Sequence, residues 1–359
     1  MNGRPVVSIA VVAGAWALAG AVAVPTAAVV LDDAVARIGE LDGIRTIQVW
    51  RGDELLVERT FRGAALGAHD VKSASKSVVS ALVGIALERG LLPGLDAELA
   101  ALLPDEAARL DDRGKRSISL GDLLSMSSGL ASTSGPAYGA WVSSSDWVRA
   151  ALARPLEHPP GTRFAYSTGN SHLVAAALSR ACSCDLLEWG REVLFGPLGI
   201  EVVGWDRDPR GIRFGGNSFL VAPADFAKLG RLYLAGGKWQ GRQLVPAEWI
   251  ERSTGRHSDG WPERYGPYGL LWWLPTLASD ERSFAAIGFG GQYLIVSPGH
   301  DAVVMITATH VGKGAPWDRE LLSIVDRELL PATRRSRRGG EGRDESRGRS
   351  PGPGAAVSR

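Results

Sequence analysis

The chain has 359 residues, of which 45% are apolar and 22% are charged, and its formal net charge is +1. This composition is ordinary for a globular protein, and the length suffices for one large domain or two smaller ones. The balanced charge gives no support for nucleic acid as a partner, and the 45 glycines show no repeat period that would indicate a collagen or a solenoid.

The N-terminal segment has the pattern of an export signal. Arg4 is followed by an uncharged stretch that continues to Leu31 and is apolar over residues 6–24. Small residues at positions 21–23 and just beyond form an A-x-A type cleavage pattern. We therefore expect residues 1–27 to be a signal peptide, with an uncleaved membrane anchor as the alternative. Either way, the body of the protein is expected to be exported: periplasmic, extracellular or held on the outer side of the membrane.

The folded part is expected to begin with a helix and a hairpin. Residues 31–41 have helical spacing, and Gly43 ends the pattern. Residues 44–50 and 54–61 alternate like strands on either side of a short turn.

The next stretch, residues 71–77, carries the first candidate chemistry. Ser73 and Lys76 are three residues apart and share one face of a predicted helix, which continues as an apolar run over residues 78–87. A serine hydroxyl becomes a good nucleophile when a base takes its proton, and a buried lysine can be that base because burial lowers its pKa. The S-x-x-K spacing alone is common by chance, so a capping serine with a solvated lysine is the alternative.

The middle of the chain, roughly residues 91–265, is predicted to be a mainly helical insert with long loops. Helical patterns begin at Ser119 and cover residues 146–152, 172–182, 185–195, 223–234 and 246–252. Within this insert, Cys182 and Cys184 are separated by one residue, a spacing that cannot build a zinc site alone. A disulfide between them would close a very small loop, so we expect two thiols near a helix end.

Strand patterns return near the C-terminus, at residues 270–274, 292–297 and 302–308, and the last two form a predicted hairpin. A helix over residues 317–330 is expected to close the domain, and the Arg- and Gly-rich residues 332–359 to form a disordered tail. Strands from both ends of the chain would then share one mostly antiparallel sheet flanked by N- and C-terminal helices. The predicted fold class is α+β, with one domain over residues 28–331.

Two further stretches suggest chemistry. Tyr166 lies in a polar loop ahead of an apolar helix, where a phenol whose pKa a nearby cation lowers could pass the Ser73 proton to a leaving group. Anchoring of the loop by one hydrogen bond is the alternative role. Gly288, Gly290 and Gly291 stand at the start of a strand. A backbone N–H there could form half of an oxyanion hole, although a plain glycine turn explains the pattern as well.

Taken in order, these motifs resemble the serine β-lactamase and penicillin-binding protein superfamily. Within it, the sequence is most similar to class C-related esterases, D-amino-peptidases and 6-aminohexanoate-dimer hydrolases. The resemblance covers roughly residues 30–330 and includes the phrases at residues 123–129, 160–167, 194–200 and 288–298. It implies an α/β sandwich beside a helical domain, with the active site between them.

The resemblance assigns roles to individual residues. Ser73 would be the acylated nucleophile, Lys76 its base and Tyr166 the partner that moves the proton. The backbone N–H groups of Ser73 and Gly291 would form the oxyanion hole. The residues implied to contact substrate are Asn170, Gly288, Gly290 and Gln292. No cofactor and no metal are implied, and the substrate would be a small-molecule or peptide ester or amide.

Two departures from the family pattern matter. Thr168 stands where the tyrosine motif usually ends in Asn, and Gly288 stands where the third motif usually begins with Lys or His. That cation normally meets the carboxylate of a penicillin or a peptidoglycan stem. We therefore expect ester or amide hydrolysis through an acyl-enzyme. The alternatives are a D,D-carboxypeptidase or β-lactamase acting on wall peptides or β-lactams, and a catalytically silent relative that binds peptides.

Overall fold

The computed structural model describes residues 27–309 and 318–334. The predicted signal peptide or anchor lies outside these residues except for its last position, and so does the predicted tail from residue 335 onward. Within the described ranges, none of the helices combines the length and the apolar character needed to span a bilayer.

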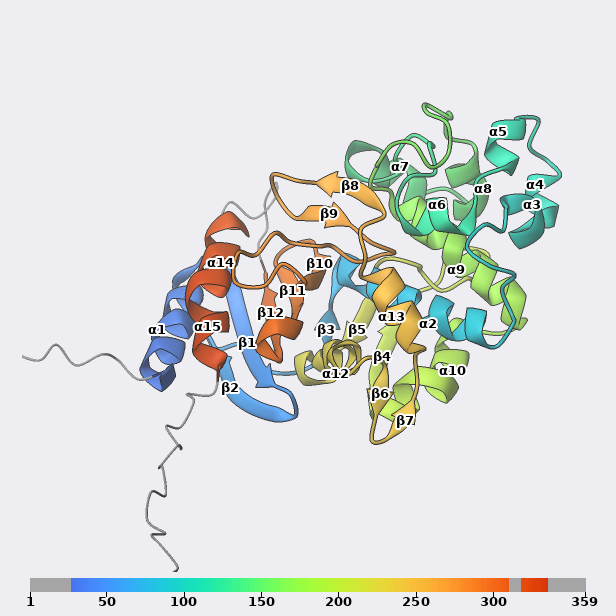
Figure 1. Ribbon diagram of the computed structural model, residues 1–359. Coiled ribbons are helices and arrows are strands. Elements are labelled where there is room, and N and C mark those ends of the chain that lie inside the picture. The colour runs from blue at the N-terminus through green and yellow to red at the C-terminus, as the bar shows by residue number, and fades with distance from the viewer. Residues whose placement is uncertain (1–26, 310–317, 335–359) are drawn as a thin grey trace, which may run out of the picture.

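A five-stranded antiparallel sheet, in the order β10-β11-β12-β1-β2, forms the centre of one half of the molecule. Its strands from the end of the chain are β10 (Phe284–Gly288), β11 (Gln292–Ser297) and β12 (Ala302–Ala308). Its strands from the start are β1 (Ile44–Arg51) and β2 (Glu54–Thr60). β1 pairs with β12, so both chain ends contribute to one sheet and the predicted α+β class is confirmed (Figure 1).

Helices cover the sheet on both faces. Helix α1 (Ala27–Glu40) packs against the C-terminal segment α14 (Asp318–Ile324), a π-helical turn (Val325–Leu329) and α15 (Leu330–Thr333), while α12 (Pro223–Leu234) packs on β11 and β12 (Figure 1). The first two residues assigned to the tail belong to α15, where Thr333 is fully buried.

Helix α2 (Lys76–Glu88) follows a 3-10 turn over Lys72–Ser75 and runs through the core. Every residue from Lys76 to Ala86 is buried, as its nearly continuous apolar surface predicts. Its buried serines do not break the helix because Ser77 and Ser80 donate their hydroxyl protons to the carbonyls of the segment 270–271, at 2.8 and 2.7 Å. The helix therefore fixes the preceding turn rigidly against the rest of the fold.

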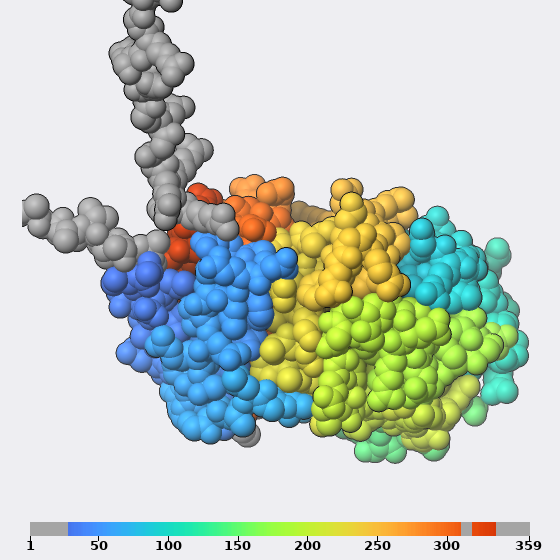
Figure 2. Space-filling model, turned by 90° about the horizontal axis from the view of Figure 1, so that it is seen from below, coloured from blue at the N-terminus to red at the C-terminus, as the bar shows by residue number. Residues whose placement is uncertain are grey.

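Apart from α12, most of the segment between β2 and β10 forms the other half of the molecule, which extends to the end opposite β1 and β2 (Figure 2). Its helices are α3 (Leu99–Leu102), α4 (Pro104–Ala107), α5 (Arg113–Arg116), α6 (Leu120–Leu124), α7 (Tyr138–Val142), α8 (Trp147–Leu152), α9 (Thr168–Cys182), α10 (Leu186–Gly190), α11 (Gly196–Leu198) and α13 (Ala247–Ser253). Seven short strands accompany them: β3 (His69–Asp70), β4 (Val202–Trp205), β5 (Phe219–Val221), β6 (Lys238–Trp239), β7 (Arg242–Gln243), β8 (Ser258–Trp261) and β9 (Gly266–Tyr268). The sequence patterns did not predict these strands, so this region is less purely helical than expected.

The strand predicted at residues 270–274 is wrong. Leu271 has a φ of +64°, which an extended strand cannot accommodate, and of this stretch only Trp273 forms bridges, with Tyr268 and Ala285. The segment is a connection that lies beside the edge strand β10.

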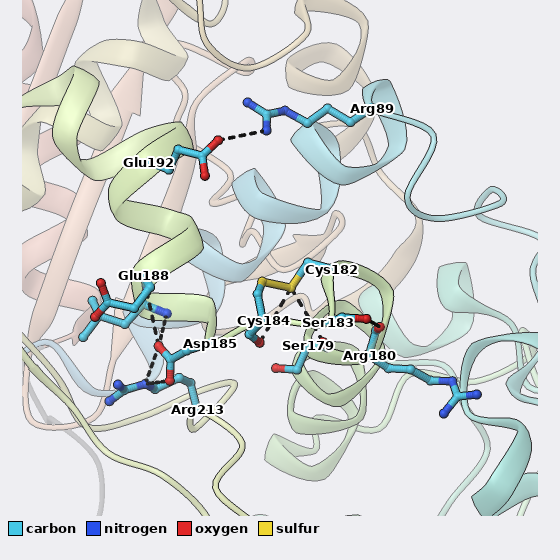
Figure 3. The surroundings of a disulfide bond; sticks show 11 residues. Arg89, Ser179, Arg180, Cys182, Ser183, Cys184, Asp185, Glu188, Glu192 and Arg213 are labelled. Atoms are coloured by element: carbon cyan, nitrogen blue, oxygen red, sulfur yellow. Dashed lines mark hydrogen bonds and ion pairs between the residues drawn. A yellow bond between two sulfur atoms is a disulfide. The ribbon is translucent and has the colours of Figure 1, made fainter.

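Cys182 and Cys184 form a disulfide, so the expectation of two free thiols is also wrong (Figure 3). Cys182 ends α9, and Ser183 adopts the left-handed conformation with φ +51°. This reversal brings the two Cα atoms within 5.1 Å, a distance that suits a disulfide. The next residue, Asp185, caps α10 and forms an ion pair with Arg213, so the disulfide lies in a well-anchored helix connection.

Removal of this disulfide is expected to cost little stability. The loop it closes is so short that the chain-entropy model gives about 1.5 kcal/mol. Unfolding of the double variant C182S/C184S in urea, compared with the oxidised parent protein, measures the difference. A loss above about 4 kcal/mol would show that the bond does more than constrain the unfolded chain.

Candidate active site

The side chains of Ser73, Lys76 and Tyr166 come together, as the sequence predicts. The 3-10 turn presents Ser73 and the first turn of α2 presents Lys76, so that Lys76 Nζ lies 3.1 Å from Ser73 Oγ. Tyr166 comes from the loop before α9; its side chain is hydrogen-bonded to Ser73, and Lys76 Nζ lies 5.1 Å from the centre of its ring. A hydroxyl, an amine and a phenol from two distant segments therefore share one small volume.

Lys76 is held in an environment that favours its uncharged form. The residue is 2% exposed, and burial lowers the pKa of Lys76 to about 7. Besides Ser73, Nζ contacts the Gly216 carbonyl at 3.0 Å and Thr168 Oγ1 at 3.4 Å, both neutral oxygens. Near pH 7 a large fraction of this amine is therefore unprotonated and can accept a proton from the serine.

Tyr166 behaves differently from the sequence-based expectation. Burial raises the pKa of Tyr166 to about 12, and the hydrogen bond with Ser73 lowers it only in part. The expectation that a neighbouring cation would lower this pKa is wrong, because the loss of solvation outweighs the other effects. The phenol stays protonated at neutral pH, so it can relay a proton but does not act as a preformed phenolate base.

A cavity of about 510 Å³ opens directly on these groups. Ser73, Tyr166 and Thr168 line it together with the turn between β10 and β11. The other side chains that line it are Lys72, Ser134, Tyr138, Asn217, Trp261, Arg264, Tyr265, Trp273, Ile287, Phe289, Tyr293 and Asp318. The cavity is large enough for a small ester or amide, and several of the side chains that line it are aromatic.

Gly288 is required by close packing. A Cβ at this position would lie 2.2 Å from the Val71 carbonyl oxygen, so only glycine lets β10 approach the turn that carries Ser73. Position 288 therefore cannot carry the cation of the third motif. If Gly288 is instead the glycine of a K-T-G type motif, the first position falls on Ala286, which is buried and uncharged. The cation is missing in either alignment.

The turn between β10 and β11 positions the backbone donors. Gly290, at φ +81°, occupies the third position of a four-residue turn, where a type II turn needs glycine. Gly291 N–H, the predicted oxyanion donor, closes this turn by donating to the Gly288 carbonyl at 3.3 Å. Ala285 N–H points to the free edge of β10, where it donates to the Trp273 carbonyl at 2.8 Å. The Gly288 carbonyl points toward Gly291, and across the trans peptide the N–H of Phe289 points the opposite way, toward the outer edge of β10, which packs against the Ser73 turn.

Two residues expected to contact substrate do not line the cavity. Asn170 is 2% exposed and accepts a hydrogen bond from Ser128 Oγ at 3.0 Å, because the first turn of α9 directs it into the protein. Gln292 is 4% exposed and donates from Nε2 to the Ala308 carbonyl at 2.6 Å. Thr168, the residue that departs from the family pattern, is the one that lies at the site.

A buried His–Asp pair that the sequence did not reveal supports Lys76 from behind. His172 is fully buried on α9; its Nε2 lies 3.0 Å from Asp208 Oδ2, and its Nδ1 accepts the Gly215 N–H at 3.4 Å. The following residue, Gly216, provides the carbonyl for Lys76, and a Cβ there would lie 2.7 Å from Nζ. The adjacent glycines were the only signal in the sequence for this close approach.

Among residues 27–309 and 318–334, no group of three or more His, Cys, Asp or Glu side chains has the arrangement of a metal site. The candidate chemistry is carried by the hydroxyl, the amine and the phenol described above.

Comparison with known proteins agrees with this geometry. The family model described as Beta-lactamase matches residues 46–327. A search by sequence among curated proteins found no match.

Three solved structures illustrate the structural likeness. A protein from Bacillus anthracis described as a 6-aminohexanoate-dimer hydrolase has a TM-score of 0.67 at 19% identity, over 82% of this chain and 78% of its own. EstCE1, described as a hydrolase with promiscuous acyltransferase activity, has a TM-score of 0.68 at 16% identity, over 86% and 99%. A mutant simvastatin synthase from Aspergillus terreus has a TM-score of 0.65 at 18% identity, over 88% and 99%. At these identities the likeness shows a shared fold.

Proposed function

The chain belongs to the beta-lactamase family, whose model matches residues 46–327, and we propose that it cleaves an ester or amide bond through an acyl-enzyme formed on Ser73. The observation that carries this proposal is the 3.1 Å contact between Lys76 Nζ and Ser73 Oγ inside a buried, neutral environment. A nucleophile in direct contact with an amine whose pKa lies near 7 is the arrangement that base-assisted acylation requires.

The acylation step uses each of the three side chains. Ser73 Oγ attacks the substrate carbonyl while its proton passes to the uncharged Lys76 amine. Tyr166, hydrogen-bonded to Ser73, gives its phenolic proton to the leaving alcohol or amine and regains one from Lys76. The products of this step are the released leaving group and an acyl ester on Ser73, with the proton count unchanged.

The developing oxyanion needs two backbone donors. Ser73 N–H is one of them, and we assign the other to Phe289, whose N–H points toward the Ser73 turn, because Gly291 N–H already closes the adjacent turn. Such fixed donors act strongly in a site that excludes water, and the aromatic walls of the cavity serve that purpose. In deacylation a water molecule attacks the acyl ester and gives one proton to the uncharged Lys76 amine. The bond to Ser73 Oγ then breaks, Oγ takes that proton back from Lys76, and the carboxylic acid is released.

The missing cation favours an ester or a simple amide over a β-lactam. The cavity lacks a lysine or histidine at position 286 or 288, so the family's usual recognition of a β-lactam carboxylate is not available at that place. An acyl-enzyme can also pass its acyl group to an alcohol, and EstCE1 is described as a hydrolase with promiscuous acyltransferase activity. Hydrolysis and acyl transfer therefore share the same first step here.

Rapid mixing with p-nitrophenyl butyrate tests the proposal. We expect a burst of about one p-nitrophenol per protein, followed by slower steady turnover, because acylation by this activated ester should be faster than deacylation. A mixture with the protein inactivated by heat provides the baseline. If the native protein releases no more p-nitrophenol than this baseline while still binding wall peptides, the catalytically silent alternative replaces the proposal.

A further inference from the structure

The active-site cavity contains a second polar centre, around Asp318 at the start of α14. The Asp318 carboxylate is 3% exposed. Its Oδ2 accepts from Arg264 Nε at 2.9 Å, from Arg264 Nη2 at 2.6 Å and from the Tyr265 hydroxyl at 2.6 Å. The Tyr293 hydroxyl donates to Oδ1. Three residues thus hold one carboxylate, and both Asp318 and Arg264 belong to the wall of the cavity that contains Ser73.

Arg264 has donors left over. A guanidinium carries five N–H groups in a fixed plane, and the contacts with Asp318 use one on Nε and one on Nη2. The side chain is 40% exposed, and the group lies 4.7 Å from the centre of the Tyr265 ring. The guanidinium is therefore fixed in place by Asp318 and Tyr265 while the rest of its N–H groups are available to the cavity. A planar donor group of this kind matches a carboxylate well.

An apolar wall leads from the nucleophile toward this centre. Tyr166 stacks on Trp273, with ring centres 5.6 Å apart, and Trp273 stacks on Trp261, at 5.1 Å. Trp261 and Phe289 are 41% and 62% exposed, although large aromatic side chains are usually buried. All four rings line the cavity, so a chain or ring of a substrate that extends from Ser73 would lie against aromatic surface.

Among the residues that the structure describes, the other cation in the cavity wall is Lys72, which is differently placed. Its Nζ is bound to Asp70 at 2.6 Å, and its backbone N–H also donates to Asp70. Lys72 is adjacent to Ser73 in the chain, so it lies at the reacting end of the cavity. Arg264 is thus the cation toward which the aromatic wall leads.

We propose that Arg264 binds a carboxylate of the substrate, and that the natural substrates are esters or amides whose apolar segment ends in a carboxylate. This inference rests on the proposed function. The cation missing from positions 286 and 288 would have met a carboxylate close to the reacting bond, whereas Arg264 meets one at the far end of an apolar spacer. The substrate class is therefore a half-ester or half-amide of a dicarboxylic acid.

The test compares charged and neutral substrates of equal length. The p-nitrophenyl half-esters of the four- to eight-carbon dicarboxylic acids are each paired with the neutral p-nitrophenyl ester of the same length. A charge-assisted hydrogen bond predicts that kcat/KM favours the anionic ester about 10- to 100-fold at the best chain length. R264Q is expected to abolish this preference, so that kcat/KM becomes equal for the anionic and the neutral ester of each pair.

Three further variants separate binding from structural damage. D318N weakens the support that fixes the Arg264 guanidinium but leaves its charge in the cavity, so it should reduce the preference for the anionic ester less than R264Q does. R282Q alters an arginine that is 73% exposed and outside the cavity wall, and it should leave the preference unchanged. K72M tests whether Lys72 causes the preference for the anionic ester. A preference that is lost in K72M but kept in R264Q would overturn the assignment to Arg264.

A binding measurement keeps this inference apart from the proposed function. In the S73A background, the dissociation constant of the best half-ester should rise about 10-fold or more when Arg264 is also replaced by Gln. If wild-type protein hydrolyses neither ester, the proposed function fails, and this binding difference still decides whether Arg264 holds the carboxylate. Equal binding with and without Arg264, or an equal loss of preference in R264Q and D318N, would refute the inference.

Discussion

Replacement of Ser73 by alanine is expected to lower ester hydrolysis at least about 1,000-fold, because the variant lacks the atom that forms the acyl-enzyme. The fold should be unaffected. Ser73 lies in a turn fixed by the buried α2 helix, and its hydroxyl bonds to Lys76 and Tyr166 rather than to structural partners. The measurement is kcat/KM on p-nitrophenyl butyrate, together with the thermal midpoint of each protein.

Ser117 offers a matched control for this variant. It is exposed, and its hydroxyl donates locally to the Gly114 carbonyl, away from the cavity. S117A should retain the parent rate. Retention of more than a tenth of the activity in S73A would mean that another group forms the acyl-enzyme.

Replacement of Lys76 by methionine or by arginine is expected to lower ester hydrolysis by a factor similar to that of S73A. Methionine offers no base, and arginine keeps its proton at any accessible pH, so K76R preserves the charge without the function. For the parent protein, kcat/KM should rise with pH through a midpoint near 7, because Lys76 must lose its proton to act as the base and its pKa is lowered to about 7. A flat profile from pH 5 to 9 would contradict this role.

The same lysine should lower stability, with a predictable pH dependence. Unfolded Lys76 binds its proton up to about pH 10.5, whereas the folded site releases it near pH 7, so the unfolded state holds more protons between these values. The penalty in the folded protein is therefore largest below pH 7, on the order of 5 kcal/mol, and it shrinks as the pH rises toward 10.5.

Urea unfolding of K76M and the parent protein measures this penalty. K76M should be the more stable of the two at pH 6. Its gain in the free energy of unfolding is reduced by about 1–3 kcal/mol, because the Gly216 carbonyl loses its hydrogen-bond partner. Its advantage should fall by pH 9.5. A difference in the free energy of unfolding that is the same at both pH values would show that the lysine is not held with a lowered pKa.

Regular elements with a clear period could be predicted from the sequence almost to the residue. The helix at Pro223–Leu234 and the strands at Gln292–Ser297 and Ala302–Ala308 have the predicted bounds, because their apolar spacing records which face is buried. The strand predicted at residues 270–274 failed because the positive φ of Leu271 is imposed by its surroundings and leaves no trace in the composition. The disulfide was missed for a similar reason, since it depends on the left-handed turn at Ser183.

The candidate site divides in the same way. Ser73, Lys76 and Tyr166 belong to local motifs whose spacing reflects a helix turn and a loop, and the structure brings them together. The tertiary structure determines which side chain of a loop or strand end faces the cavity. The prediction from sequence named Asn170 and Gln292 as substrate contacts, whereas Thr168 is the residue that lines the cavity. Pairs formed by distant segments, such as His172 with Asp208 and Arg264 with Asp318, have no spacing signal at all.

Labelling with a fluorophosphonate probe, followed by mass spectrometry of the modified peptide, tests the central claim most directly. The account predicts one adduct per protein, located on Ser73, with labelling that becomes faster as the pH rises through 7 and that is absent from S73A. A native protein that stays unlabelled at pH 8, or that carries the adduct on a different serine, would contradict it.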